Sequence, residues 1–366
     1  MVKARRFEPV DTGGNGVVIG MSGGVDSAAA AWSLRESGFR TVGATLHLLH
    51  SQTAAGRSRS GLNGTPGERA KRLCALLGIE HHTIDLRDLF HGAVVEPFID
   101  EYRRGRTPNP CITCNEKIKF PALVSLADRL GCAFIATGHY ARLVRPAGGR
   151  PLLATAADLR KDQSYFLYRV PVNILERTVF PVGGLTKTDV RRIASQLGME
   201  TSASNESQDV CFLAGTDLES FLSEKIAPKP GEVTDTEGRV LGSHGGVFRY
   251  TVGQRRGLGI ARGVPLYVSK IDAGRSRVVV SEDVGLYAMG ARVGRLRLRK
   301  KTLGGPLTAK IRYRHPPASV KAVTRGSGRL EVDFLEPQRA VTPGQSLVLY
   351  RENVVVGGGI IECVLE

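Results

Sequence analysis

The chain of 366 residues holds 51 lysine and arginine residues against 35 aspartate and glutamate residues, which gives a formal net charge of +16 at pH 7. This excess favours a polyanionic partner, nucleic acid first, whose binding would depend on salt. The basic N-terminus has no apolar leader, and no run approaches the roughly 20 apolar residues of a membrane span, so we expect a cytoplasmic protein with no membrane partner.

The first predicted elements surround the sequence SGGVDS at residues 22–27. An apolar strand at 17–21 leads into it, after a lead-in over residues 1–15, and a helix-forming run follows to about Gly38. A strand, a glycine turn and a helix N-terminus collect several backbone N–H groups at one point, which is typical of an anion site.

The residue types in this turn indicate a nucleoside triphosphate. Gly23 and Gly24 let the backbone approach a phosphate closely, and the hydroxyls of Ser22 and Ser27 can donate to phosphate oxygens. Asp26 can hold the Mg2+ that accompanies the nucleotide. The lysine of a Walker loop is absent, and the turn resembles instead the pyrophosphate loop of enzymes that cleave ATP between its α and β phosphates.

The next segments alternate between predicted strands and helices. In chain order we expect a strand at 41–46, a surface loop at 51–67, a helix from 68 that Gly78 ends, a strand at 82–84, helices at 86–102 and 120–130, and a strand at 133–136. This alternation predicts a doubly wound α/β domain whose parallel sheet binds its nucleotide beyond the strand carboxyl ends. Leu46 and Gly138 come at two such ends, where Leu46 can pack against a purine.

The residue pattern of the chain changes after a capped helix at 185–194 and the polar sequence SNESQDVCF at 204–212. Many short alternating runs divided by glycine and proline turns then predict one or two small β domains. Residues 291–330 contain twelve lysine and arginine residues and no acidic residue, which favours a phosphate-binding surface. After the lead-in, the predicted domains are 16–214, 215–285 and 286–366.

Three of the six cysteines have the setting of core residues, and three do not. Cys74 has helical apolar spacing, Cys132 precedes a buried strand, and Cys363 lies near the C-terminus. In a reducing compartment the six are not expected to form a structural disulfide framework.

The other three cysteines occur beside polar motifs or chain breakers. Cys111 and Cys114 form a CxxC after Pro110, and Cys211 follows Cys114 by 97 residues. No second CxxC or histidine pair completes a tetrahedral zinc site. Two functional interpretations stay open beside that of unreactive cysteines: a persulfide carrier with a second, resolving cysteine, or an iron–sulfur cluster held by three thiolates.

Ordered motifs along nearly the whole chain give it a family resemblance. They are GMSGGVDS at 20–27, TPNPCITCNEKIKF at 107–120, ATGHYAR at 136–142, KDQSYFL at 161–167, SQDVCF at 207–212, YTVGQRRGLGI at 250–260, RYRHPP at 312–317 and AVTPGQ at 340–345. In these motifs the chain resembles the tRNA-specific 2-thiouridylases, tRNA-uridine 2-sulfurtransferases that make 2-thiouridine at the wobble position. Families that share only the loop, such as argininosuccinate synthetases, lack the two cysteine motifs.

The resemblance implies an α/β catalytic domain, a small central domain and a C-terminal β-barrel that grips tRNA. It implies that Cys114 is a nucleophile, that Cys211 carries the persulfide, and that the two form a transient disulfide. It implies ATP contacts at Gly20, Met21, Ser22, Gly23, Gly24, Val25, Asp26, Ser27, Leu46 and Gly138. The implied contacts with the target base or tRNA are Asn109, Pro110, Cys111, His139, Lys161, Asp162, Gln163, Arg312, Tyr313 and Gln345.

One departure from the family concerns Cys111, where many members carry aspartate. A thiol is a poorer general base than a carboxylate at neutral pH unless its pKa is lowered, and it adds the third thiolate that a cluster needs. We therefore expect ATP and Mg2+ as cofactors, a wobble-uridine tRNA and an upstream persulfide donor as partners, and cluster-assisted transfer as the alternative mechanism. An ATP-regulated RNA-binding protein without chemistry is the alternative from a different class.

Overall fold

The computed structural model describes residues 14–50, 65–199, 210–213, 215–260, 262–299, 303–325 and 328–365. The predicted lead-in, most of the predicted 51–67 loop, the start of SQDVCF and two lysines of the basic run lie outside the described residues. The chain forms two units: unit 1 comprises residues 1–93, 111–215 and 353–355, and unit 2 comprises 94–110, 216–352 and 356–366. Among the described residues, no helix combines the length and the apolar character needed to cross a bilayer.

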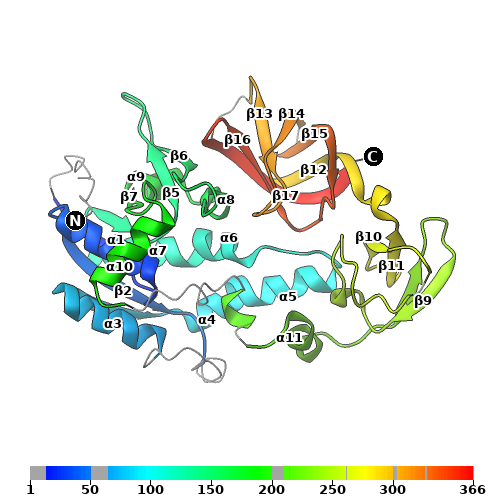
Figure 1. Ribbon diagram of the computed structural model, residues 1–366, viewed down its shortest axis with the longest axis horizontal. Coiled ribbons are helices and arrows are strands. Elements are labelled where there is room, and N and C mark those ends of the chain that lie inside the picture. Colours follow the sequence, from blue (N-terminus) through cyan, green and yellow to red (C-terminus); the bar gives the residue numbers. More distant parts are fainter. Residues whose placement is uncertain are drawn as a thin grey trace. The chain divides into compact units, whose positions relative to one another are not determined.

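Unit 1 is built on a five-stranded parallel sheet in the order β3-β2-β1-β4-β7 (Figure 1). The strands are β1 (Gly16–Gly20), β2 (Arg40–His47), β3 (Glu80–Asp85), β4 (Phe134–Ala136) and β7 (Thr178–Val179). The central strand β1 buries Val17, Val18 and Ile19 completely, as expected of a strand covered on both faces. The predicted doubly wound α/β domain is confirmed.

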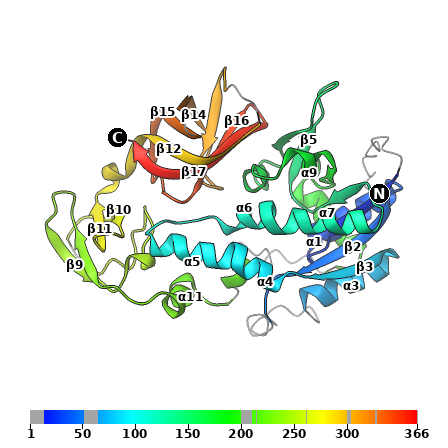
Figure 2. The same ribbon diagram turned by 180° about the vertical axis from the view of Figure 1, so that it is seen from behind.

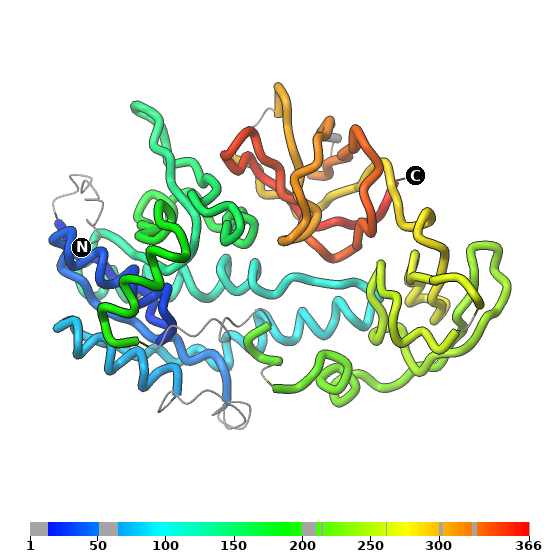
Figure 3. Tube along the Cα trace, in the orientation of Figure 1, coloured from blue at the N-terminus to red at the C-terminus, as the bar shows by residue number. Residues whose placement is uncertain are grey.

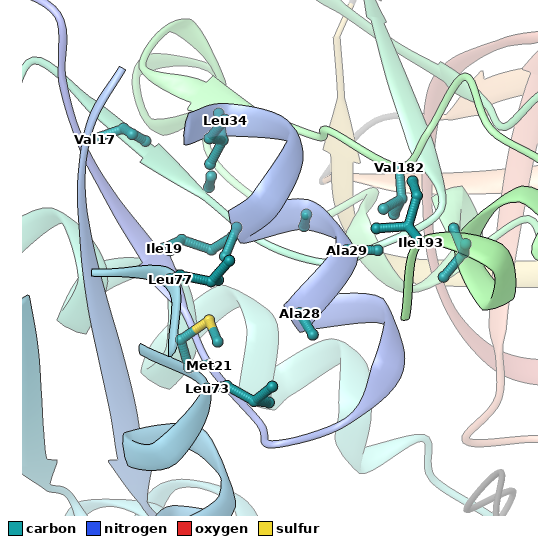
Figure 4. Close-up of a cluster of buried hydrophobic side chains, with 14 of the residues drawn as sticks. Val17, Ile19, Met21, Ala28, Ala29, Leu34, Leu73, Leu77, Val182 and Ile193 are labelled. Carbon is teal, nitrogen blue, oxygen red and sulfur yellow. The ribbon is translucent and has the colours of Figure 1, made fainter. Parts of the chain in front are cut away.

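The core of unit 1 joins β1 to helices on its faces (Figure 4). Helix α1 (Val25–Glu36), which Figures 1 and 2 show from opposite sides, turns the fully buried alanines 28–31 inward, and their small side chains let α10 (Lys187–Gln196) pack against it. Helix α3 (Pro66–Leu77) contributes Leu73 and Leu77 and ends, as predicted, at Gly78, which has a left-handed φ of 63°.

The predicted helix at 86–102 is interrupted by a π-helical turn. It consists of α4 (Arg87–Phe90), the π-turn η1 (His91–Val95) and α5 (Glu96–Arg103). Pro97 explains the interruption, because proline lacks an N–H and its ring clashes with the carbonyl four residues earlier in an α-helix. The same order of elements occurs around Pro121. There α6 (Pro110–Cys114) is followed by the π-turn η2 (Asn115–Lys119) and by α7 (Phe120–Arg129).

The remaining elements of unit 1 are short. They are β5 (Ala141–Val144), β6 (Leu152–Thr155), α8 (Ser164–Leu167), α9 (Val172–Glu176) and the 3-10 turn η4 (Cys211–Leu213).

Unit 2 contains a small four-stranded sheet in the order β10-β11-β8-β9 and a β-barrel. The first sheet is formed by β8 (Gly231–Thr234), β9 (Val240–His244), β10 (Tyr267–Asp272) and β11 (Arg277–Ser281). Helix α11 (Leu218–Lys225) precedes it, and the 3-10 turns η5 (Val247–Arg249) and η6 (Asp283–Leu286) lie within and after it.

The barrel strands follow the order β12-β15-β14-β13-β16-β17, and the pairing of β12 with β17 closes the ring. They are β12 (Tyr287–Leu298), β13 (Leu307–Lys310), β14 (Ala318–Arg325), β15 (Arg329–Arg339), β16 (Ser346–Arg351) and β17 (Val354–Leu365), drawn in yellow to red in Figure 1. Val293, Val332, Leu347 and Ile361 fill the interior and are fully buried. The predicted C-terminal β-barrel is confirmed.

The described part of the basic run 291–330 includes residues of four barrel strands, β12, β13, β14 and the start of β15. Carboxylates from outside the run neutralise part of it: Arg292 pairs with Glu331 over 3.3 Å, and Arg329 pairs with Glu362 over 3.1 Å. The run is therefore less uniformly positive on the folded barrel than along the sequence, because neighbouring strands bring acidic side chains next to it.

Candidate active site

The turn after β1 forms a compact network of two hydroxyls. The Oγ atoms of Ser22 and Ser27 lie 3.2 Å apart, Ser22 N–H donates to Ser27 Oγ over 3.3 Å, and Ser27 Oγ donates to Gly24 O over 2.9 Å. Gly24 is the N-cap residue of α1, and glycine has no side chain that could accept a hydrogen bond from the helix N-terminus. The N–H groups of the first helical turn, including that of Val25, therefore face the point where an anion would bind.

Two glycines at this turn are required by close packing. Gly23 has a φ of +73°, and a Cβ there would lie 2.4 Å from Pro66 O. A Cβ on Gly138, which follows β4, would lie 2.9 Å from the Asp26 carbonyl carbon and the Ser27 nitrogen. The loop is thus held between the start of α3 and the end of β4, and Gly20 and Met21 before it belong to the strand end and the core.

The acidic residue of the loop is bound by a lysine that sequence reasoning missed. Lys187 Nζ and the Tyr140 hydroxyl each donate to Asp26 Oδ1 over 2.8 Å. The Lys187 side chain is 8% exposed, whereas that of Asp26 is 37% exposed. Lys187 is the first residue of α10, just after the N-cap Thr186. The capped start of this helix is the sequence feature that could have drawn attention to Lys187. The fold therefore supplies from α10 the cation that the loop itself lacks.

The KDQSYFL segment holds Tyr140 in place through hydrogen bonds. Gln163 Oε1 accepts from Tyr140 N–H over 2.9 Å, and Gln163 N–H donates to Tyr140 O over 2.7 Å. Asp162 is 4% exposed and accepts from the N–H groups of Ala156 and Ser164. Asp162 and Gln163 thus fix Tyr140 and its loop, while the neighbouring Lys161 is half-buried.

Leu46 lies on the same edge of the sheet as the loop. Gly20, the last residue of β1, pairs with Ala44 of β2, so Leu46 projects two residues beyond the end of β1. It is half-buried. This is the place at which a purine beyond the strand ends would meet an apolar side chain.

The three non-core cysteines gather in unit 1. Cys111 is half-buried, Cys114 is buried and Cys211 is exposed. Cys111 and Cys211 are both close enough to Cys114 for their charge to affect its pKa. The position of Cys211 is fixed by its neighbour Phe212, which is buried and packs edge-on against Phe90 with ring centroids 6.0 Å apart.

Lys119 is a second residue that sequence reasoning missed. Lys119 ends the π-turn that follows Cys114 and lies five residues after it, the spacing of the hydrogen bonds in a π-helix. Desolvation raises the pKa of all three thiols, that of Cys114 to about 12, and the Lys119 ammonium opposes this rise at each of them. Desolvation lowers the pKa of Lys119 in turn, but the three sulfur groups raise it by more. Lys119 is thus the cation that would stabilise sulfur anions here.

The π-turn that follows α6 is also bound to the segment around KDQSYFL. Asn115 Nδ2 donates to Phe166 O over 3.2 Å, and Arg169 pairs with Glu116 over 2.6 Å. These bonds hold the π-turn directly behind Cys114.

Within the described ranges, no three histidine, cysteine or carboxylate side chains are arranged to hold a metal ion. The cysteine cluster therefore does not fit an iron–sulfur cluster in this arrangement.

The three cysteines predicted to lie in the core differ in burial. Cys74 and Cys132 are buried, as predicted, and burial raises the pKa of Cys74 to about 11, whereas Cys363 is only half-buried.

His139 contacts two aromatic rings of unit 1. Its ring stacks on Phe120 with centroids 6.0 Å apart and meets the ring of Phe180 edge-on, while Nδ1 lies 2.8 Å from Thr137 Oγ1. Burial, and secondarily the Lys119 charge, lower the pKa of His139 to about 3. The imidazole is therefore neutral at pH 7 and suits a hydrogen bond or a stacked base better than a phosphate.

The other predicted tRNA contacts lie in unit 2. Arg312 Nη1 donates to Arg339 O and Ala340 O, each over 3.3 Å, and the Lys310 ammonium lies 5.9 Å from the Tyr313 ring centroid. Gln345 donates to backbone carbonyls of the segment that ends in Asn109 and Pro110. Asn109 is half-buried and Pro110 buried, at the start of α6.

Three family models match successive parts of the chain. They are described as a tRNA methyl transferase HUP domain over residues 15–215, a tRNA methyl transferase PRC-barrel domain over 219–282, and an aminomethyltransferase beta-barrel domain over 295–361. Together they span nearly the whole chain.

Curated relatives of similar length carry one description, tRNA-specific 2-thiouridylase MnmA. The relative from Nostoc punctiforme is 42% identical over 94% of this chain and 98% of its own. The relative from Moorella thermoacetica is 42% identical over 95% of this chain and 100% of its own. A third, from Caldanaerobacter subterraneus, is 42% identical over 95% of this chain and 98% of its own.

Proposed function

Because the chain belongs to the tRNA-specific 2-thiouridylase family, we propose that it replaces O2 of the wobble uridine in tRNA by sulfur, at the expense of ATP. The observation that carries this proposal is the meeting of Cys111, Cys114 and Cys211 around Lys119, in the unit that also holds the phosphate-binding turn. An adenylating loop and a pair of sulfur-carrying cysteines are the two parts that such a reaction needs.

In the first step, O2 of the uridine attacks the α-phosphorus of ATP, and pyrophosphate leaves. The Gly20–Ser27 turn would bind the phosphates through its N–H groups and hydroxyls, and Leu46 and Gly138 would adjoin the nucleoside. Lys187 would stabilise the negative charge that develops on the phosphates. Asp26 is the carboxylate that would hold Mg2+, which supplies further charge neutralisation when bound.

In the second step, sulfur replaces the activated oxygen. The terminal sulfur of a Cys211 persulfide attacks C2, and the C2–O2 bond breaks so that AMP leaves with the oxygen. The Cys114 thiolate then attacks Cys211 Sγ, which breaks the sulfur–sulfur bond, leaves sulfur on C2 and forms a Cys114–Cys211 disulfide. A cellular thiol reductant regenerates the cysteines. Lys119 would stabilise the sulfur anion in each attack.

The partners follow from this chemistry. A wobble-uridine tRNA would bind through the basic barrel, with Arg312, Tyr313 and Gln345 among its contacts, and the flipped base would lie near Asn109–Cys111. An upstream persulfide donor would load Cys211, and the reaction would take place in the cytoplasm. The domain boundaries given above and the identity of these contacts stay predictions.

Oxygen labelling tests the adenylation step. In a reaction with tRNA that carries 18O at O2 of the wobble uridine, we expect the label in AMP, with one AMP for each 2-thiouridine formed. Label released into water would contradict adenylation of the base. A tRNA with cytidine at the wobble position is the control, and it should give no AMP above background.

A further inference from the structure

The segment 104–109, which joins α5 to α6, is packed against the four-stranded sheet of unit 2. After α5 the chain turns back along this helix (Figure 3), and Arg106 N–H donates to Glu101 O over 2.9 Å while its Nε donates to Glu101 Oε2 over 2.7 Å. Gly105 has a φ of +67°, and a Cβ there would lie 2.5 Å from Cγ2 of Ile271 in β10. The start of the segment is therefore closely fitted to the sheet.

A turn of the barrel holds the backbone of Thr107 on both sides. Thr107 N–H donates to Pro343 O over 2.9 Å, and Gln345 Nε2 donates to Thr107 O over 2.8 Å. Gly344 has a φ of +94°, and a Cβ there would lie 2.8–3.0 Å from the N, C and O atoms of Thr107. Residues 343–345 thus satisfy both polar groups of one peptide residue and leave no space for a side chain between them.

The turn is itself bound to β17 of the barrel. Gly344 N–H donates to Ile361 O, and Ile361 N–H donates to Gln345 O, each over 2.9 Å. Arg106 Nη2 donates to the same Ile361 carbonyl over 3.3 Å. The position of the turn is therefore set by a barrel strand and not by an independent loop.

A threonine of the YTVGQ sequence completes the contact from the central domain. Thr107 Oγ1 donates to Thr251 Oγ1 over 3.3 Å, and the buried Tyr102 hydroxyl forms hydrogen bonds with both threonines. Thr251 N–H donates to Gln254 Oε1 over 3.0 Å, so the threonine and the glutamine of this sequence fix each other. Two sequences that take no part in the proposed catalytic steps, YTVGQ and AVTPGQ, thus meet at Thr107.

The connection from Thr107 to Cys111 is short and stiff. Pro108 and Pro110 fix their own φ angles and restrict the residues before them to extended conformations. Pro110 is the first residue of α6, which carries Cys111 and Cys114. A shift of Thr107 would be passed along the rigid proline dipeptides to the start of this helix.

We propose that residues 343–345 and Thr251 form a clamp on Thr107, the Thr107 clamp, which positions the start of the cysteine helix α6, with Gln345 as a positioning residue. The proposal rests on the proposed function for the chemistry of the cysteines. Gln345, proposed above as a tRNA contact, thereby gains a positioning role as well. Its amide donates to Thr107 O and, over 3.5 Å, to Pro108 O.

Two variants break the clamp in different ways. Gln345→Ala removes the amide, whereas Gly344→Ala keeps the amide but places a methyl group against the Thr107 backbone. Gly304→Ala is the matched control, because a Cβ there meets no atom within 4 Å, and Gln338→Ala controls for loss of a barrel amide. Thermal unfolding of each variant establishes that the full chain remains folded.

Hydrogen exchange tests the clamp without reference to activity. We expect exchange of the Thr107 amide to become about tenfold faster or more in both clamp variants, as for the loss of one hydrogen bond, and to stay unchanged in both controls. Unchanged exchange in both clamp variants would overturn the proposal, even if the wild-type protein made no 2-thiouridine.

Steady-state thiolation separates positioning from tRNA binding. We expect both clamp variants to lower kcat about tenfold, with KM for tRNA changed by less than about threefold. If Gln345→Ala raises KM alone and Gly344→Ala has no effect, Gln345 is a tRNA contact and the clamp does not position α6. Wild-type protein assayed in parallel distinguishes failure of the clamp from failure of the proposed function.

Discussion

Replacing Cys211 by serine is expected to abolish 2-thiouridine formation, by on the order of 10³-fold or more, while pyrophosphate is still released from ATP in the presence of tRNA. Serine cannot carry a sulfane sulfur, whereas the Gly20–Ser27 turn, which we propose binds the phosphates, is unchanged. Nucleoside mass analysis and pyrophosphate release, measured on the same sample, check the two halves of this result. Retained 2-thiouridine would show that Cys211 is not the sulfur carrier.

Replacing Cys114 by serine is expected to stop the same reaction one step later. Without the resolving thiolate, sulfur on C2 should stay joined to Cys211, and a covalent protein–tRNA adduct should accumulate. A thiol reductant should release 2-thiouridine from it. Intact-mass analysis detects the adduct, and Cys363→Ser, in the barrel, is the control that should react normally.

Cys111→Ala distinguishes the persulfide mechanism from cluster-assisted transfer. A relay between Cys114 and Cys211 should continue at a reduced rate, because in that mechanism Cys111 carries no sulfur and only adjoins the flipped base. A cluster held by three thiolates should be lost with one of them. Complete inactivity of this variant, with loss of bound iron from the wild-type level, would contradict the relay.

Replacing Lys187 by alanine is expected to lower the rate of pyrophosphate release about 10²–10³-fold, the usual effect of removing a charge that stabilises the transition state. The Lys187 side chain is 8% exposed and donates to Asp26, so water and dissolved cations cannot easily take the place of its charge. Pyrophosphate release under single-turnover conditions, with Lys187→Arg as the conservative variant, measures the effect. We expect arginine to restore part of the rate.

A control on the same helix separates catalysis from folding in this experiment. Arg192→Ala lies on α10 and removes a side chain that is 56% exposed, so its rate should match the wild type. If Lys187→Ala and Arg192→Ala react equally fast, Lys187 holds the loop without acting on the phosphates.

Much of the fold follows from local pattern. The buried strand β1, the glycine turn and the helix α1 are contiguous, so periodicity and composition were enough to predict them. The barrel strands alternate with turn residues in the same readable way. The predicted 86–102 helix was interrupted because a proline near its middle favours a π-turn, a departure that periodicity does not encode.

The missed site residues act across long sequence distances or through unusual local geometry. Lys187 reaches Asp26 over 161 positions, a contact that depends on how α10 packs on α1. Lys119 interacts electrostatically with the three cysteines and is joined to Cys114 by a π-turn, which periodicity does not predict. Asp162 has the residue type of a surface contact, but the fold buries it as a loop support. Residue type and spacing alone could not give these positions.

We propose that this chain makes 2-thiouridine by adenylation and persulfide transfer. The most direct test is nucleoside mass analysis of a wobble-uridine tRNA transcript after incubation with iron-free protein, ATP, Mg2+ and a persulfide donor. We predict 2-thiouridine at the wobble position that disappears when ATP is omitted. Formation of 2-thiouridine only after anaerobic reconstitution with iron, or its formation without ATP, would contradict this account.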